Sequence, residues 1–427
     1  MDTRICSRSL TPLLPSRTAW RIRSRSTAPI SSPPSPSRWA AFVAGYLARL
    51  VGLPSIVGYL LAGVAVGPFT PGLVADPHEA QQLAEIGVVL LMFGVGLHFS
   101  IKDLIGVHRV AVPGAVVQIA IATALGTAAG SWFGWSFRSS LVLGLAISVA
   151  STVVLLRALR HRGATDSEPG RVAIGWLIFE DLFTVVALVL LPVIASATDT
   201  QHAGTTSLVG TGLMIGAALG KAVLLAALML VVGSRVLPWV LTRVEGEGSR
   251  ELFTLAVLAA AIGIAFASAQ IFDVSLALGA FLAGAVISES RIRDRAAADI
   301  LPLTDVFTVL FFVSVGMLLD PAIIASHPKE ILAVLAIVVL GKSLAAFVIV
   351  VALRRSRDVG RTVAAGLAQI GEFSFIVATA AQGLGMLPDE GFQVIVAVAL
   401  LSITVNPALF ALTPDAQTRS MESALRS

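Results

Sequence analysis

The chain alternates between long apolar runs and short polar connections along nearly its whole length. Thirteen runs can be delimited, at about 39–52, 54–68, 83–99, 110–133, 139–159, 172–195, 208–237, 251–270, 273–288, 301–319, 329–353, 360–384 and 390–412. Turn signals such as Gly-Pro, Asp-Pro and Pro-Asp fall between several of them. Most runs are long enough for a helix to cross a bilayer. The pattern predicts an all-α polytopic membrane protein with about 13 transmembrane helices.

Composition agrees with a membrane protein and argues against other classes. Hydrophobic residues make up 56% of the chain and charged residues 13%, with a mean hydropathy of +0.88, far from the range of soluble proteins. The single Cys6 has no partner for a disulfide or a cysteine-based metal site. Outside residues 1–38 the net charge is −2, so we expect no basic surface for nucleic acid. We expect no cofactor and no enzymatic activity.

The distribution of Lys and Arg predicts the orientation. If alternate loops face the cytoplasm, nineteen basic residues lie on that side, and only Arg138 and Lys329 lie on the other. Cytoplasmic loops carry the excess of Lys and Arg in membrane proteins. The C-terminal tail, residues 413–427, is therefore expected in the cytoplasm, and a bacterial inner (plasma) membrane is the expected location.

Residues 1–38 do not fit this topology. They are rich in Arg, Ser and Pro, and their seven arginines would have to cross the membrane ahead of a first run of only about fourteen residues. Such a composition resembles a transit peptide. It equally fits a wrong start site or a shifted reading frame that replaced the first half of helix one, and the short first run favours this second interpretation. We assign residues 39–412 to the transmembrane domain.

The chemistry of the chain centres on an acid pair. Glu180 and Asp181 are the only charged side chains between Val172 and Thr198. A charge at membrane depth costs a few kcal/mol or more and indicates function, with a partner nearby. An acid that binds either a proton or a cation is what a cation:proton exchanger needs.

Small hydroxyl residues precede the acidic run. Ser148, Ser151 and Thr152 interrupt the apolar stretch AISVASTVVLLRAL. They are either packing and backbone-bonding sites within a continuous helix or mark a broken helix whose exposed backbone groups coordinate an ion.

A second polar cluster lies within AAGLAQIGEFSFIVATAA, where Gly366 and Gly371 weaken the helix beside Gln369 and Glu372. A break here would come just before the final apolar run, 390–412. The first break, at Ser151–Thr152, comes in the same way just before the run that holds the acid pair, 172–195. This correspondence predicts two inverted six-helix repeats, runs 1–6 and 8–13, whose broken helices cross near the bilayer midplane.

Lys342 is the only charge between Glu330 and Arg354. It lies near the middle of its run, where a lysine cannot easily extend to the interface. We expect it to pair with Glu180 or Asp181.

Together these motifs resemble the monovalent cation:proton antiporter-2 family, and its Kef-type branch in particular. The resemblance rests on the acid pair, on Ser151–Thr152, on Lys342, on Gln369-x-Gly371-Glu372-Phe373, and on the stretches LPSIVGYLLAG (53–63), EIGVVLLMF (85–93), ALGAFLAG (277–284) and FFVSVGM (311–317). It covers residues 39–412. It implies a thirteen-helix inverted-repeat fold, a homodimer, and a mobile ion-carrying core in which Asp181 binds the ion at the Ser151–Thr152 crossing.

This chain departs from the family in two ways. Many Kef-type members have Gln before the aspartate, where this chain has Glu180; related electrogenic sodium:proton exchangers have an acid there, paired with a lysine placed like Lys342. The stoichiometry therefore stays open. Kef-type proteins also commonly continue into a cytoplasmic nucleotide-binding domain, whereas only a short tail follows Pro414. We expect that control to be absent, truncated or supplied by a separate regulatory subunit.

The sequence thus predicts secondary active exchange of K⁺ or Na⁺ for protons by alternating access. Asp181 would bind the monovalent cation or a proton, and Glu180 would either co-ligate the cation or be neutralised by Lys342. The alternatives are proton-coupled export of another solute or drug on the same fold, and an ion channel, for which no TVGYG-like filter is present. An intramembrane aspartyl protease would need its two acids on different helices.

Overall fold

The structure is a computed structural model that describes residues 36–50, 53–70, 77–98, 101–165, 167–197, 208–272 and 274–413. The N-terminal segment 1–38, apart from the start of the first helix, and the tail 413–427, apart from Thr413, lie outside these ranges. The two domain boundaries predicted there stay predictions.

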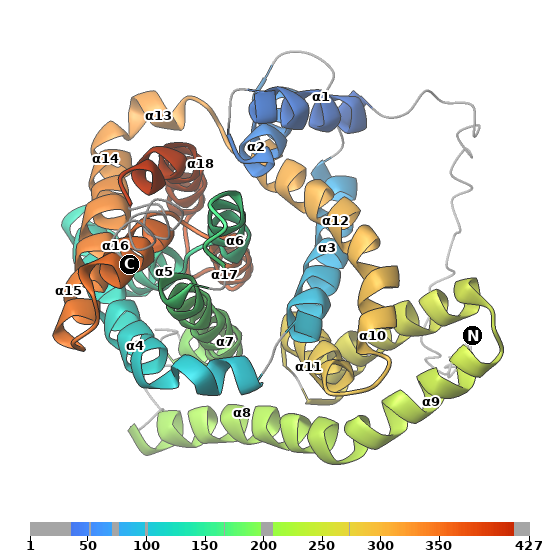
Figure 1. Ribbon diagram of the computed structural model, residues 1–427. Helices are drawn as coiled ribbons and strands as arrows, with labels where there is room; N and C mark the ends of the chain where they lie inside the picture. Colours follow the sequence, from blue (N-terminus) through green and yellow to red (C-terminus); the bar gives the residue numbers. More distant parts are fainter. Residues whose placement is uncertain are drawn as a thin grey trace, which may run out of the picture. The chain divides into compact units, whose positions relative to one another are not determined.

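Every regular element in the described ranges is a helix (Figure 1). The first half of the chain contains α1 (Pro36–Leu50), α2 (Ser55–Val66), α3 (Pro77–His98), α4 (Ile101–Trp132), α5 (Phe137–Ser148), α6 (Thr152–His161) and α7 (Glu168–Ala197). A linking segment follows, made of α8 (Leu208–Leu228), the π-helical turn η1 (Met229–Gly233) and α9 (Ser234–Gly246). The second half contains α10 (Arg250–Phe272), α11 (Leu276–Ser288), α12 (Arg293–Met317), α13 (Ile323–Ser326), α14 (Pro328–Ala336), the π-helical η2 (Ile337–Lys342), α15 (Ser343–Ala352), α16 (Arg357–Leu367), α17 (Glu372–Gly383) and α18 (Asp389–Ala411).

Each of the thirteen predicted runs overlaps one helix or one chain of consecutive helices. Several bounds differ. The helices α3, α4 and α12 begin before their predicted runs, at Pro77, Ile101 and Arg293, and the linking helix continues through α9 to Gly246. The short α13 was not predicted. By length and composition, eight helices of the described residues can cross a membrane, or nine if the bent pair α16–α17 counts as one span. Three shorter apolar helices accompany them. The nearly all-helical membrane fold is confirmed, whereas the count of thirteen spans and the inverted repeats stay predictions.

The helices pack in two groups. In one group α3 packs against α11 and α12, α2 packs against α1 and α12, and α10 packs against α11. In the other group α4 packs against α5 and α7, α15 packs against α16, and α17 contacts α5, α7 and α18 (Figure 1). The second group contains both predicted helix breaks, Lys342 and the acid pair.

Glycine pairs allow the closest helix contacts. A Cβ on Gly63 of α2 would lie 2.1 Å from the Val313 carbonyl oxygen of α12, and a Cβ on Gly316 would lie 2.2 Å from the Leu60 oxygen. Small residues permit such backbone approach in membrane helices, where packing rather than the hydrophobic effect drives association. The stretches LPSIVGYLLAG and FFVSVGM are therefore the two sides of one contact.

Candidate ion-binding site

The second helix group contains two broken helices. α5 ends at Ser148 because Val149 and Ser151 adopt extended conformations, with φ, ψ of −100°, 138° and −82°, 120°. α6 then begins at Thr152, and the Ser151 hydroxyl caps it by accepting from the Val154 N–H at 3.2 Å. Likewise α16 ends at Leu367, α17 begins at Glu372, and their axes differ by 43°. Both breaks predicted from the sequence are present.

The two breaks lie directly against each other. The Gly371 N–H donates to the Val149 carbonyl at 3.2 Å, and the Gln369 side-chain amide donates to the Ser151 carbonyl at 3.1 Å. A Cβ on Gly371 would lie 2.5 Å from the Ala150 oxygen, so this approach requires glycine. The breaks therefore cross at residues 149–151 and 369–371.

Side chains bond the carbonyl groups that the end of α5 leaves free. Ser374 donates to the Ala146 carbonyl, Lys342 to the Ile147 carbonyl at 3.2 Å, and Gln118 to the Ser148 carbonyl at 3.1 Å. Backbone groups without partners are costly at membrane depth, and broken helices persist where neighbours satisfy them. This bonding keeps the first break stable inside the protein.

The second break is supported in the same way. The Ser402 hydroxyl accepts from the Ile370 N–H at 3.2 Å, and the Asn406 amide donates to the Ala365 carbonyl at 2.8 Å. Sequence reasoning singled out neither of these residues, nor Ser374, and gave Gln118 no part in the site. Their one signal was a single polar residue inside an apolar run, which is also common at ordinary helix contacts.

The acid pair lies in the middle of α7 and is buried, with Glu180 0% and Asp181 5% exposed. Glu180 Oε2 accepts from the Ala150 N–H at 2.8 Å. Asp181 Oδ2 accepts from the Thr152 hydroxyl at 3.0 Å. Both acids therefore contact the first break, one through its backbone and the other through a side chain at the start of α6.

Lys342 differs from the prediction in its direct partners. Its Nζ is fully buried at the end of η2 and donates to the carbonyls of Ile147 (3.2 Å) and Gln369 (3.0 Å). Among the ion pairs within 4.0 Å in the described residues, none includes Lys342, so the direct pair expected with Glu180 or Asp181 is absent. Lys342 and Glu180 interact electrostatically over a longer distance. The ammonium bonds the carbonyls because both breaks present carbonyl oxygens at this point.

Glu372 is the first residue of α17 and is 3% exposed. Its carboxyl group interacts with the Ser151 hydroxyl and electrostatically with Asp181. The structure thus brings together all the residues predicted for the site: the acid pair, both hydroxyls, Lys342, Gln369, Gly371 and Glu372.

The charges at the crossing match the helix dipoles. The carboxylates of Asp181 and Glu372 lie at the N-terminal ends of α6 and α17. The Lys342 ammonium lies at one carbonyl in the last turn of α5 and at another just after α16. The N-terminus of a helix favours negative charge and its C-terminus favours positive charge. Four half-helix ends therefore stabilise three charges that the surrounding apolar side chains would otherwise disfavour.

Several oxygens at the crossing have no hydrogen-bond partner in the protein. They are Asp181 Oδ1, Glu372 Oε2, Glu180 Oε1 and Gln369 Oε1. Buried polar atoms are nearly always paired, so such a group calls for an explanation. Carboxylate, amide and hydroxyl oxygens are the ligands that hard cations prefer. No group of three or more His, Cys, Asp or Glu side chains placed to hold a metal ion occurs within the described ranges.

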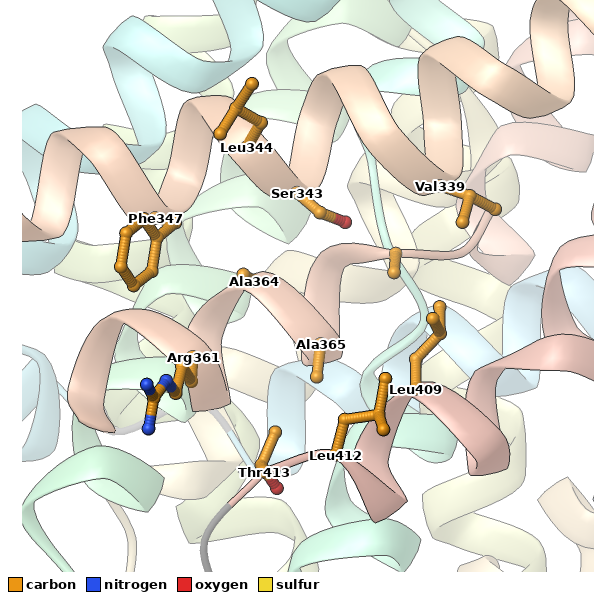
Figure 2. Close-up of a pocket in the computed structure, with 11 residues that line it drawn as sticks. Val339, Ser343, Leu344, Phe347, Arg361, Ala364, Ala365, Leu409, Leu412 and Thr413 are labelled. Atoms are coloured by element: carbon orange, nitrogen blue, oxygen red, sulfur yellow. The ribbon is translucent and has the colours of Figure 1, made fainter. Parts of the chain in front are cut away.

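A cavity elsewhere in this helix group has a different chemistry. It measures about 290 Å³ and is lined by residues of η2, α15, α16 and α18, together with Ala368, Leu412 and Thr413 (Figure 2). Figure 2 shows Arg361 at one side of it and the Ser343 hydroxyl at another. Its lining contains none of the three buried carboxylates, although it includes Ala368, which lies in the second break between α16 and α17.

Comparisons with known proteins agree on one family. The family model described as "Sodium/hydrogen exchanger, transmembrane" matches residues 39–413. The protein YbaL of Escherichia coli (strain K12), named as a cation/proton antiporter, is 53% identical over 384 residues, which cover 90% of this chain and 68% of YbaL. K(+) efflux antiporter 5 of Arabidopsis thaliana is 31% identical over 88% of this chain and 65% of its own length.

A solved structure shows the same fold. The sodium proton antiporter MjNhaP1 from Methanocaldococcus jannaschii, solved at pH 8, aligns with a TM-score of 0.66 over 88% of this chain and 96% of that chain. The two sequences are 16% identical, so this likeness concerns the fold alone.

Proposed function

Since the chain belongs to the sodium/hydrogen exchanger family, we propose that it exchanges a monovalent cation for protons at the crossing of its two broken helices, with Asp181 as the exchanging carboxylate. The protein is an integral membrane secondary transporter. The observation that supports Asp181 is its position: the side chain is 95% buried, one oxygen accepts from Thr152, and Oδ1 has no protein partner.

Competition at one carboxylate couples the two fluxes. A buried Asp181 that binds a dehydrated cation cannot hold a proton at the same time, and the reverse also applies. Release of one species on one side of the membrane therefore prepares the site for the other. The helix group that carries the crossing would move against the group of α1–α3 and α10–α12, exposing Asp181 to each side in turn.

The cation is K⁺ or Na⁺. K⁺ is named for the Arabidopsis relative and sodium in the description of the family. Both ions bind oxygen ligands, and cavity size and flexibility select between them. Proton flux driven by each cation separately in proteoliposomes, at a clamped membrane potential, measures this selectivity and the coupling ratio.

Asp181→Asn tests the proposal. The amide keeps the shape of the side chain and removes the charge, so we expect cation-dependent proton flux in everted vesicles to fall by about 100-fold or more. Asp294→Asn is the matched control, because Asp294 is exposed in the first turn of α12, away from the middle of the span, and should retain normal flux. Normal exchange by Asp181→Asn protein, at wild-type abundance in the membrane, would contradict the assignment.

We further propose a homodimer that uses the linking segment. Only 17% of the most apolar part of Gly220–Gly246 is buried, which is the lowest share among the candidate membrane spans. Its Val223, Leu224 and Leu230 are each more than 60% exposed. Light scattering in detergent would give the mass, and disulfide crosslinking from Val223→Cys would locate the contact. A monomer at all concentrations would contradict the dimer.

The orientation and setting follow from the loop charges. We propose a bacterial inner membrane location with the C-terminus in the cytoplasm, because the predicted cytoplasmic loops hold the excess of Arg and Lys. A separate regulatory subunit would bind on that side. The inverted repeats remain part of the proposal, supported by the matching order of the broken pairs α5–α6 and α16–α17 before α7 and α18.

A further inference from the structure

Asp181 and Glu372 approach the crossing from different sides. Asp181 comes from the middle of α7, and Glu372 begins α17. Two consecutive hydroxyls of the first break serve them separately: Thr152 donates to Asp181 at 3.0 Å, and Ser151 interacts with Glu372. The crossing therefore joins two carboxylates through one short hydroxyl segment.

Each of these carboxylates keeps an oxygen without a protein partner. Asp181 Oδ1 and Glu372 Oε2 are buried and accept no hydrogen bond from the protein. The two residues are only 5% and 3% exposed. The residue before Glu372, Gly371, lies so close to the first break that a Cβ on it would be 2.9 Å from the Ser151 nitrogen, and Asp181 and Glu372 interact electrostatically. Two like charges so placed repel each other unless a proton or a cation neutralises them.

Glu180 has a different environment. Its Oε2 accepts from the Ala150 N–H at 2.8 Å, and its charge is opposed by the Lys342 ammonium. Lys342 is itself held by the Ile147 and Gln369 carbonyls, so this pair of charges is compensated within the protein. Glu180 Oε1 also has no hydrogen-bond partner in the protein, but the Lys342 ammonium already opposes the charge of this carboxylate, so a second positive charge is not needed there.

We propose that the transported cation is bound jointly by the carboxylates of Asp181 and Glu372, and that Glu180 is a positioning residue of the first break that does not touch the cation. This inference rests on the proposed exchange at Asp181. It names the second ligand of that site, and it gives Glu180 a structural rather than an ion-carrying role.

Glu372→Gln tests the second ligand, because it removes the charge and preserves the size. We expect the cation concentration for half-maximal proton flux to rise at least about tenfold. The K⁺ or Na⁺ concentration needed for a given stabilisation of the purified protein in thermal melts, compared with choline, should rise by the same factor, because this stabilisation depends on the logarithm of cation concentration over Kd.

Two variants provide the controls. Glu390→Gln makes the same change in the first turn of the next helix, α18, where the side chain is exposed, and should leave the cation dependence unchanged. Glu180→Gln should lower the melting temperature in choline, because the Ala150 bond and the charge balance with Lys342 are weakened. The K⁺ or Na⁺ concentration that gives a fixed added stabilisation of this variant should stay within about threefold of the wild-type value.

The outcomes separate the two levels of the proposal. Wild-type cation affinity in Glu372→Gln, with Asp181→Asn inactive, would overturn the joint site and leave exchange at Asp181 standing. Normal exchange in Asp181→Asn would instead remove the proposed function. If Glu372→Gln does not accumulate, Glu372→Asp applies the same test: a carboxylate shortened by one methylene should change the relative affinities for Li⁺, Na⁺ and K⁺, and unchanged ratios would contradict the inference.

Discussion

Replacing Gly371 by alanine tests whether the close crossing of the two breaks is needed for stability and transport. Gly371 has φ −90° and ψ 170°, an extended conformation that alanine adopts freely. The cost of the change therefore comes from space alone. The new Cβ would lie 2.5 Å from the Ala150 oxygen, 2.6 Å from its carbonyl carbon and 2.9 Å from the Ser151 nitrogen.

The size of the effect follows from these contacts. Three backbone atoms lie too close, and none of them belongs to a flexible side chain, so the breaks must separate by roughly 1 Å. Overpacking of this kind costs about 1–3 kcal/mol. Separation also stretches the Gly371 N–H to Val149 bond, now 3.2 Å, whose loss adds about 1 kcal/mol. We expect a loss of about 2–4 kcal/mol in the free energy of unfolding.

The assay is unfolding of the purified protein in mixed micelles, followed by cation-dependent proton flux in proteoliposomes. Gly383→Ala is the matched control, because Gly383 ends the same helix and no atom lies within 4 Å of a Cβ there. Alanine should leave the protein equally stable or stabilise it by up to about 1 kcal/mol. The flux of Gly371→Ala should fall at least about tenfold, since separated breaks displace Thr152 from Asp181. Wild-type stability and flux in Gly371→Ala would refute this reasoning.

Two further substitutions test the bonding around the breaks. Lys342→Met leaves the Ile147 and Gln369 carbonyls without their donor and Glu180 without its counter-charge, so we expect a loss of about 3–5 kcal/mol in unfolding. Adding Glu180→Gln should recover part of this loss in a double-mutant cycle, and strictly additive effects would contradict the electrostatic link. Gln118→Leu leaves the Ser148 carbonyl unpaired and should cost about 1–2 kcal/mol. The same change at Gln382, which bonds Asp389 at an exposed site, should stay within about 0.5 kcal/mol, and equal losses at both positions would show that the Ser148 bond is not special.

The sequence was sufficient to locate the breaks but not to assign their bonds. Ser151–Thr152 and Gly371–Glu372 stand out because small or charged residues interrupt apolar runs, and both helices break within a residue or two of these positions. The donors to the freed carbonyls come from distant segments. Lys342, for example, bonds Ile147 across 195 residues, a contact that no local pattern encodes. Lys342 was therefore placed correctly in the site and interacts electrostatically with Glu180, but its direct bonds to the two carbonyls were not predicted.

Hydropathy locates the apolar part of a helix but not the residue at which the helix ends. The seventh apolar run stops near Leu237, yet the helix continues to Gly246 through SRVLPWVLTRVEG. That last stretch is amphipathic, and its polar residues formed no apolar signal. Similarly, Ser402 and Asn406 are isolated polar residues in the apolar run of α18. Nothing in the pattern distinguished them from polar residues at an ordinary helix contact.

The adjacency of Glu180 and Asp181 in the sequence does not make them one functional unit. Successive residues on a helix point about 100° apart and do not face each other. The structure follows this geometry, since Glu180 is directed to the Ala150 N–H and Asp181 to the Thr152 hydroxyl. The partner that completes the Asp181 site therefore has to come from another helix, and we propose Glu372, a buried carboxylate at the crossing that interacts with Asp181 electrostatically. Whether residue 180 is Gln or Glu then changes how the first break is hydrogen-bonded. In the joint site that we propose, the number of carboxylates that bind the cation depends on residue 372.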